Sequence, residues 1–344
     1  MPSNYHKYLH RFAYFTAVCT FFLIIAGGLV TSTGSALAVP DWPLSYGQLM
    51  PPMVGGIFYE HGHRMVATFV GVLAIILAVW LWKKEERRWL RVLGLIALSA
   101  VILQGVLGGL TVLYMLPTAI SVSHAALAQT FFAIVVSIAL FTSRWWKSEQ
   151  PLLTETDHAA STLTLCTVTT GAVYLQLILG ALMRHTDSGL AVPDFPLAYG
   201  QLFPALSSES IEAYNHQLIY EDIRLAADGP ITSGQIIIHM VHRLWATVVA
   251  VLILWTSLRL RKVSSSAKRF SKFSYLLTAL LMLQIALGAL TVLSGKAVHV
   301  TTAHVATGAL LLVSCVLTSL HLLRVSERSV LRIPFLITGK EAVA

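Results

Sequence analysis

Four histidines occur at positions that repeat along the chain, and imidazole is a common ligand of haem iron. A His-Arg pair stands at residues 63–64 and again at 242–243, and a further histidine stands at 124 and again at 304. Six-coordinate haem iron takes two histidines, which two helices of a bundle can supply from one depth. The pattern therefore predicts two sites, formed by the pairs His63 with His124 and His242 with His304.

Each of these histidines taken alone is more typical of a hydrogen-bonded residue at a membrane interface. The ends of membrane helices tolerate histidine readily. Four histidines in repeated register favour the interpretation as ligands, because ionisable groups inside membrane proteins usually face the bundle interior and mark a functional site.

The two candidate sites differ by one carboxylate. Glu60 stands three residues before His63, which places both on one face of a helix, whereas the position three residues before His242 is His239. This asymmetry predicts a reactive site in the first half and a cofactor site in the second. The alternative for Glu60 is a solvated carboxylate at the headgroup level that pairs with Arg64. His61 is expected at the interface, and His239 beside the ligand as a hydrogen-bond partner.

The arginine after each histidine is a candidate for binding haem propionates. Guanidinium groups bind carboxylates with two parallel hydrogen bonds, so Arg64 and Arg243 suit this role. The alternative is an arginine that anchors a helix end at the interface. Asp41 and Asp194 lie in a loop that occurs twice, and we expect each of them to cap a short outer helix, with a place in the site as the alternative.

The chain that positions these residues has the composition of an integral membrane protein. Of its 344 residues, 56% are hydrophobic and 12% are charged, with a mean hydropathy of +0.72. A membrane-spanning helix needs about 20 mostly apolar residues. Eight windows meet this requirement, the first of them read as a helix and not as a cleaved signal peptide: 12–32, 64–82, 92–115, 123–142, 161–183, 236–258, 273–294 and 301–323.

The distribution of charge predicts the orientation. Of the 24 basic residues, 19 fall in the two tails and in the loops after the second, fourth and sixth windows, which the positive-inside rule assigns to the cytoplasm. The loop from 184 to 230 has seven acids against two bases and is expected outside. Both termini are then cytoplasmic, and the candidate haem sites lie toward the outer face. The pI of about 9.5 thus reflects topology and not binding of nucleic acid.

The two halves of the chain are related by an internal repeat. GSALAVPDWPLSYGQ at 34–48 matches SGLAVPDFPLAYGQ at 188–201, and LQGVLGGLTV at 103–112 matches LQIALGALTV at 283–292. Each half has an even number of helices and enters the membrane in the same direction, so the repeats are parallel. We expect an all-α membrane protein of two four-helix bundles related by a pseudo-twofold axis, comprising residues 1–150 and 151–344. The three cysteines lie in separate helices and predict packing roles.

Together these motifs resemble the haem A synthase family, from about residue 12 to residue 323. The motifs that carry the resemblance are GS-x-LAVPDWPL-x-YGQ, E-x-x-HR at 60–64, the two LQ-x-x-LG-x-LTV helices, SHAALAQ at 123–129, and the second HR with AH-V-A-TGA. The resemblance implies an oxidoreductase of the bacterial inner membrane that oxidises the C8 methyl of haem O to a formyl group, giving haem A for terminal oxidases. Some relatives carry a cysteine pair in the outer loops, and this sequence has none there.

The resemblance also implies roles for individual residues. Glu60 matches the catalytic glutamate, His63 and His124 match the ligands of the substrate haem O, and His242 and His304 match those of a haem b cofactor. It implies haem O synthase as a partner and an electron acceptor that the sequence does not identify. Two other classes stay open: a dihaem b-type electron-transfer protein, which has no need of Glu60, and a parallel-repeat transporter, which needs charges at mid-membrane, where the helices are apolar.

Overall fold

The computed structural model describes residues 5–148, 159–221, 223, 229–263 and 268–326. Eight of its helices are long and apolar enough to cross a membrane. They are α1 (Lys7–Ser32), α2 (Gly55–Lys84), α3 (Arg88–Leu113), α4 (Thr118–Thr142), α6 (Ala159–His185), α8 (Ser233–Lys262), α9 (Lys268–Leu293) and α10 (Val298–Val325). The predicted multi-pass, all-helical membrane protein is confirmed.

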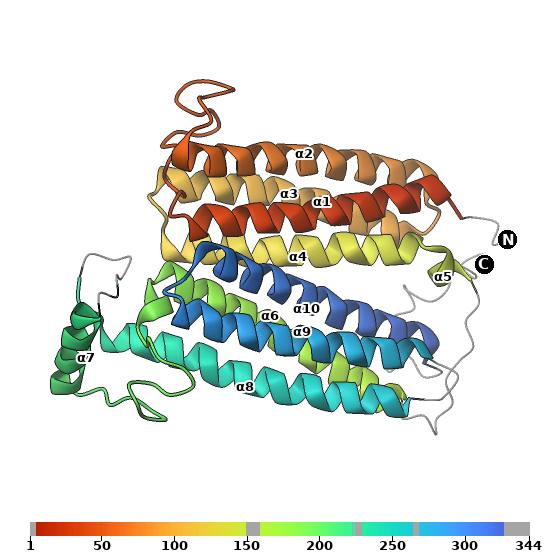
Figure 1. The fold of residues 1–344 in the computed structure, drawn as a ribbon. Coiled ribbons are helices and arrows are strands. Elements are labelled where there is room, and N and C mark those ends of the chain that lie inside the picture. The colour runs from red at the N-terminus through yellow and green to blue at the C-terminus, as the bar shows by residue number, and fades with distance from the viewer. Residues whose placement is uncertain (1–4, 149–158, 222, 224–228, 264–267, 327–344) are drawn as a thin grey trace.

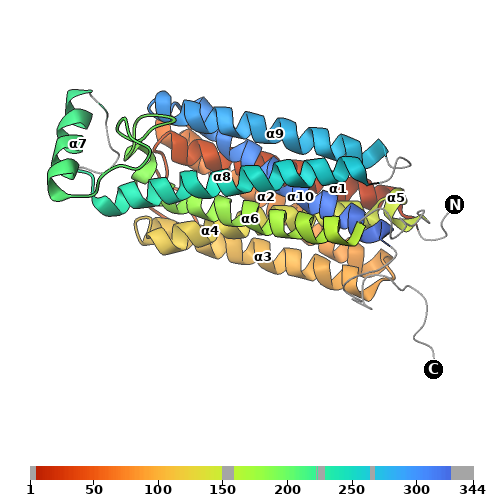
Figure 2. The ribbon, with the colours of Figure 1, turned by 90° about the horizontal axis from the view of Figure 1, so that it is seen from below.

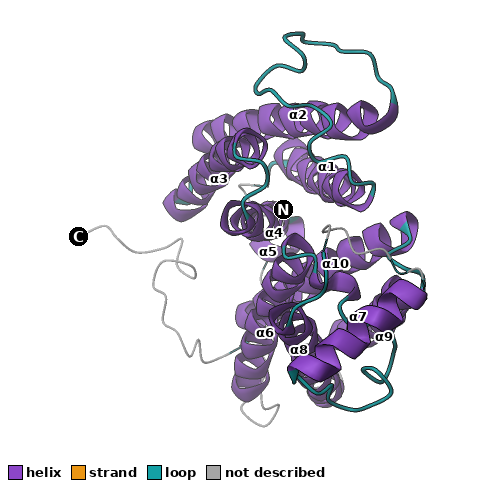
Figure 3. Ribbon diagram, turned by 90° about the vertical axis from the view of Figure 1, so that its left-hand side faces the viewer, coloured by secondary structure: helices purple, strands orange, loops and turns teal. Residues whose placement is uncertain are grey.

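The helices form two groups of four, seen end-on in Figure 3. In the first group α1 contacts α2, α2 contacts α3, α3 contacts α4, and α4 returns to α1. In the second group α6, α8, α9 and α10 contact one another in the corresponding order. The groups meet where α1 and α4 pack against α10 and α6, and α10 is the most buried of the eight helices. Both groups therefore present the same order of neighbours to any site between their helices.

Each group has its own apolar core, and a small cluster joins them. Leu77, Leu81 and Ile138 are among the fully buried side chains of the first core, and Ile253 and Leu277 among those of the second. Between the groups a separate buried cluster is formed by Ile24, Phe132, Ala309 and Val313.

The helix that carries Glu60 is longer than its apolar window indicates. Helix α2 begins at Gly55, nine residues before the predicted start at 64, and so includes Glu60 and His63. A hydropathy window excludes the stretch before 64 because it holds Glu60, His61 and His63. The polar residues therefore lie inside a continuous helix and have fixed directions relative to one another.

Three short helices were not predicted: α5 (Arg144–Lys147), η2 (Ser188–Leu190) and α7 (Ser208–Tyr220). Helix α7 lies beyond the ends of the long helices and runs across their direction (Figures 1 and 2). The Ser207 hydroxyl caps it by accepting the Ser210 N–H. The Tyr214 ring of α7 stacks on Tyr199 at a centroid distance of 3.7 Å. The long acidic loop thus contains a helix that packs on the repeated loop before it.

The two repeated loops are closed by the same hydrogen bonds. The Asp41 carboxylate accepts the N–H groups of Tyr46 and Gly47, at 2.7 and 2.8 Å. Asp194 accepts those of Tyr199 and Gly200 in the same way, at 2.8 and 2.9 Å. These backbone hydrogen bonds lower the pKa of Asp41 below its usual value. The expectation that the two aspartates cap short outer helices is wrong, because both of them close a tight turn.

Candidate functional site

All four histidines lie near the starts of their helices, at one end of the bundle. His63 is on α2, His124 on α4, His242 on α8 and His304 on α10, and these helices begin at the end opposite the N-terminus (Figure 1). His63 and His124 lie on helices of the first group, and His242 and His304 lie on helices of the second. The structure thus brings each sequence-predicted pair together within one four-helix group.

Each histidine ring packs against a glycine of the preceding long helix. A Cβ atom built on that glycine would lie only 3.0 to 3.2 Å from Cε1 of the ring. The four contacts are Gly27 with His63, Gly108 with His124, Gly180 with His242, and Gly288 with His304. A side chain at any of these glycines would displace the imidazole, so glycine is needed there for each ring to keep its position.

Three of the four histidines have a ring nitrogen without a hydrogen-bond partner. Nδ1 of His63, His124 and His304 is buried and has no hydrogen-bond partner among the described residues. Buried polar atoms are normally satisfied, so an unpartnered one points to a bound group or water. No cluster of three or more His, Cys, Asp or Glu suited to a metal ion occurs in the described ranges. Paired neutral imidazoles without a carboxylate ligand fit haem iron and do not fit a bare cation.

Glu60 is buried, with only 4% of its surface exposed. One carboxylate oxygen accepts a hydrogen bond from Arg64 at 2.7 Å, and the other accepts the backbone N–H of Val39 at 2.8 Å. The alternative of a solvated carboxylate at headgroup level is therefore wrong, although its pairing with Arg64 is present. A buried carboxylate held by two donors keeps a fixed position one helical turn from His63.

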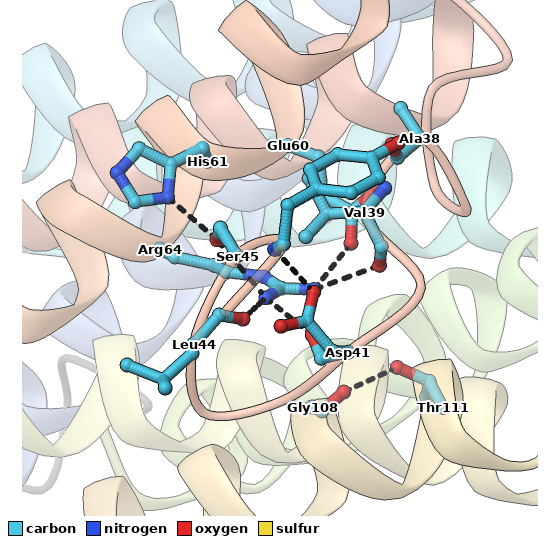
Figure 4. A network of polar contacts seen from close by, with 11 residues as sticks. Ala38, Val39, Asp41, Leu44, Ser45, Glu60, His61, Arg64, Gly108 and Thr111 are labelled. Carbon is cyan, nitrogen blue, oxygen red and sulfur yellow. Dashed lines mark hydrogen bonds and ion pairs between the residues drawn. The ribbon is translucent and has the colours of Figure 1, made fainter. Parts of the chain in front are cut away.

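The two arginines fasten the outer loops to the helices. The Arg64 guanidinium donates to the carbonyl oxygens of Asp41 and Leu44, at 2.8 and 2.9 Å, and reaches Val39 O at 3.2 Å (Figure 4). Sequence reasoning missed this role, since carbonyl acceptors leave no signal in the sequence. Binding of haem propionates by Arg64 stays a prediction.

Arg243 repeats this arrangement in the second half. It donates to the carbonyl oxygens of Leu197, Val192 and Asp194, at 2.9, 3.2 and 2.6 Å. None of the ion pairs found in the described part of the chain involves Arg243. A propionate role for Arg243 likewise stays a prediction.

The second half has no carboxylate where the first has Glu60. His239 occupies that position, is 1% exposed, and contacts the carbonyl oxygen of Ser188 through Nδ1 at 2.9 Å. It bonds to the loop and not to His242. His61 is also buried, and its Nδ1 lies 2.8 Å from the Ser45 hydroxyl of the outer loop. Its position at the membrane interface stays a prediction. The two halves thus match in their ligand pairs and differ in the group beside them.

Three glutamines beside the histidines were not singled out as functional residues. They are Gln104, Gln176 and Gln284, and each has its side-chain amide near one of the ligand histidines. A signal for all three is present in the sequence, because each stands in an LQ-x-x-LG segment, where the glutamine precedes the ring-contacting glycine by four residues.

Eight apolar helices in two groups of four, each group carrying one of the two histidine pairs, define a multi-pass membrane protein. The chain matches the COX15-CtaA family of cytochrome oxidase assembly proteins over residues 10–56 and 55–316. It therefore belongs to that family.

Its relatives are haem A synthases. The chain is 29% identical to the haem A synthase of Halalkalibacterium halodurans over 309 residues, which cover 87% of this chain and 92% of that protein. It is 29% identical to the haem A synthase of Oceanobacillus iheyensis over 315 residues, covering 87% and 89%. With the haem A synthase of Shouchella clausii it shares 32% identity over 213 residues, covering 60% and 69%.

Proposed function

We propose that this protein oxidises the C8 methyl of haem O to a formyl group and so produces haem A. The single observation that carries the proposal is the buried Glu60, which stands beside only one of the two histidine pairs. The N-terminal half, residues 1–150, holds haem O through His63 and His124. The C-terminal half, residues 151–344, holds haem b through His242 and His304. Family membership and the relatives' names support this assignment.

Glu60 acts at the substrate, and the bound haem supplies the redox chemistry when present. The carboxylate can take a proton from water or stabilise positive charge that develops at the methyl carbon. Arg64 and the Val39 N–H orient it, so that it need not rearrange when charge develops. Burial strengthens such an interaction because little water screens it.

The matched contacts of the two helix groups support a pseudo-twofold relation between the halves. The same order of helix neighbours, the same aspartate-closed loops and the same glycine–histidine contacts occur in both. A gene-duplicated pair of haem sites can then diverge, one retaining a cofactor and the other turning over substrate.

A dihaem electron-transfer protein without catalysis is the second candidate, favoured only by the symmetry of the ligands. The test is conversion of haem O in a host that makes haem O but no haem A.

In this proposal the haem sites lie toward the outer face of a bacterial inner membrane. Basic residues gather at the ends of α2 and α8, on the side of the N-terminus, and the loops with Asp41 and Asp194 lie at the other end (Figure 1). A reporter fused within 83–91 or 259–272 is expected to report cytoplasm, and one fused within 207–228 the outer side. An inverted result for both fusions would overturn the orientation.

The glycine contacts lead to a prediction with an internal control. Gly180→Ala places a methyl group 3.1 Å from Cε1 of His242, whereas a Cβ at Gly171 of the same helix meets no atom within 4 Å. We expect Gly180→Ala to lower haem b affinity by about tenfold or more, since displacement of a ligand costs this much elsewhere. Gly171→Ala should retain wild-type haem b. The measurement is the low-spin absorbance per purified protein, and equal haem b in both variants would contradict the need for glycine beside the ring.

A further inference from the structure

A glutamine stands one helical turn before three of the four glycines that contact the histidine rings. The pairs are Gln104 with Gly108, Gln176 with Gly180, and Gln284 with Gly288. Residues four apart lie on one helix face, so each glutamine meets the same histidine as its glycine. In α1 the corresponding residue, four positions before Gly27, is Leu23. His63 is thus the one ligand of the four whose glycine lacks this companion.

Two of the glutamines bind the backbone of their histidine. Nε2 of Gln104 donates to the carbonyl oxygen of His124 at 2.9 Å, and Nε2 of Gln176 donates to that of His242 at 3.1 Å. The Gln176 amide also lies against the His242 ring, 3.2 Å from Nδ1 and 3.1 Å from Nε2. Both backbone bonds cross from one helix to the next and fix the helix position, and Gln176 also contacts the ring.

The third glutamine contacts the ring alone. Nε2 of Gln284 lies 3.4 Å from Nε2 of His304. The atoms that are joined thus differ among the three, but each glutamine contacts the histidine whose ring packs on the glycine four residues later.

The carbonyl oxygens of the same glutamines are left without a donor. Oε1 of Gln104, Gln176 and Gln284 is buried and unpartnered within the described ranges. A buried acceptor without a partner is destabilising unless a bound state supplies a donor. An imidazole that binds iron through one nitrogen carries a proton on the other, and this N–H needs an acceptor.

We propose that Gln104, Gln176 and Gln284 are positioning residues, each of which holds one candidate ligand histidine in place; we call this contact a clamp. His63 has no such glutamine and is therefore the exchangeable ligand. The inference rests on the proposed function. The haem b site then has two clamped ligands, His242 and His304, which suits a resident cofactor. The substrate site has one clamped ligand, His124, and one unclamped, which suits a haem that must leave after oxidation.

The proposal predicts opposite effects for removing and adding a clamp. Gln176→Leu and Gln284→Leu should speed the loss of haem b from purified protein to excess apomyoglobin by about tenfold or more, the usual cost of losing a ligand's hydrogen-bond partner. Leu23→Gln should slow the loss of haem O from the substrate site by about tenfold. Electron paramagnetic resonance of ferric haem b should shift in Gln176→Leu, because the signal depends on ring orientation.

Gln129→Leu is the matched control. Gln129 is a buried glutamine on α4 whose Oε1 is also unpartnered, and no hydrogen bond between described residues joins it to a histidine. This variant should keep the wild-type rates and resonance signal, which separates the clamp from a general need for buried glutamine.

The outcomes separate this inference from the proposed function. If Gln176→Leu and Leu23→Gln both release haem at wild-type rates while the wild-type protein holds haem b, the clamp is wrong and the proposed function stands. If the wild-type protein holds no haem b at all, the proposed function itself fails, and the clamp with it.

Discussion

Glu60→Gln is expected to abolish most haem A production while leaving haem b in place. Glutamine has the size of glutamate and can still accept the Val39 N–H that binds the carboxylate at 2.8 Å. It cannot take a proton or carry the negative charge that faces Arg64. A single positioned acid–base group contributes about 100-fold or more, so conversion of haem O should slow by at least that factor. The measurement is the ratio of haem O to haem A in membranes, with haem b content as the reference.

Glu85→Gln is the matched control for this variant. Glu85 follows the other end of α2, is also buried, and pairs with Arg87 at 2.8 Å. It also pairs with Lys147 at 3.2 Å, and its substitution removes a buried carboxylate at the opposite end of this helix from the histidine pairs. Folded protein carrying Glu85→Gln should therefore convert haem O at the wild-type rate.

The result that would contradict a catalytic Glu60 is a wild-type level of haem A in Glu60→Gln. Glu60 would then have a structural role, and the dihaem electron-transfer protein would be favoured.

Replacing the histidines should separate the two haems. His242→Ala and His304→Ala are each expected to reduce low-spin haem b to below about a tenth of wild type, since loss of an axial ligand exceeds the 10- to 100-fold cost of losing its hydrogen-bond partner. His63→Ala and His124→Ala should keep haem b and lose substrate binding and conversion. The reason is that each pair lies within its own helix group.

His299→Ala provides the control for the histidine series. His299 lies on α10, five residues before His304, and is exposed. It has no counterpart in the first half of the chain, and its replacement should leave both haems bound. Loss of haem b from His63→Ala with retention in His242→Ala would reverse the assignment of the two halves.

Much of this fold could be predicted from the sequence because the membrane constrains it strongly. A spanning segment must satisfy its backbone internally, so apolar stretches near 20 residues long identify helices. The same rule predicts the start of α2 too late, because Glu60 and His63 belong to the helix but lie before its apolar part. Helix α7 was missed because it lies outside the membrane helices and is only weakly apolar (Figure 2).

The ligand histidines could be predicted because side-chain type and register are visible in a repeat. What surrounds them could not, since it depends on contacts between helices that are distant in sequence. Arg64 reaches backbone carbonyls more than 20 residues away in Asp41 and Val39, and any residue type could supply those acceptors. The burial of His61 follows from the Ser45 hydroxyl of the folded loop. The glycines that contact the rings become visible only when a ring is placed against them.

Extraction of haem from purified wild-type protein, followed by chromatography, tests the central claim most directly. The protein would be made in a host that supplies haem O but has no other source of haem A. We predict haem b in near-equal amount to the sum of haem O and haem A, because one histidine pair holds each kind. Recovery of haem b alone, with both sites filled and no haem O or haem A, would contradict the proposed division between a substrate half and a cofactor half.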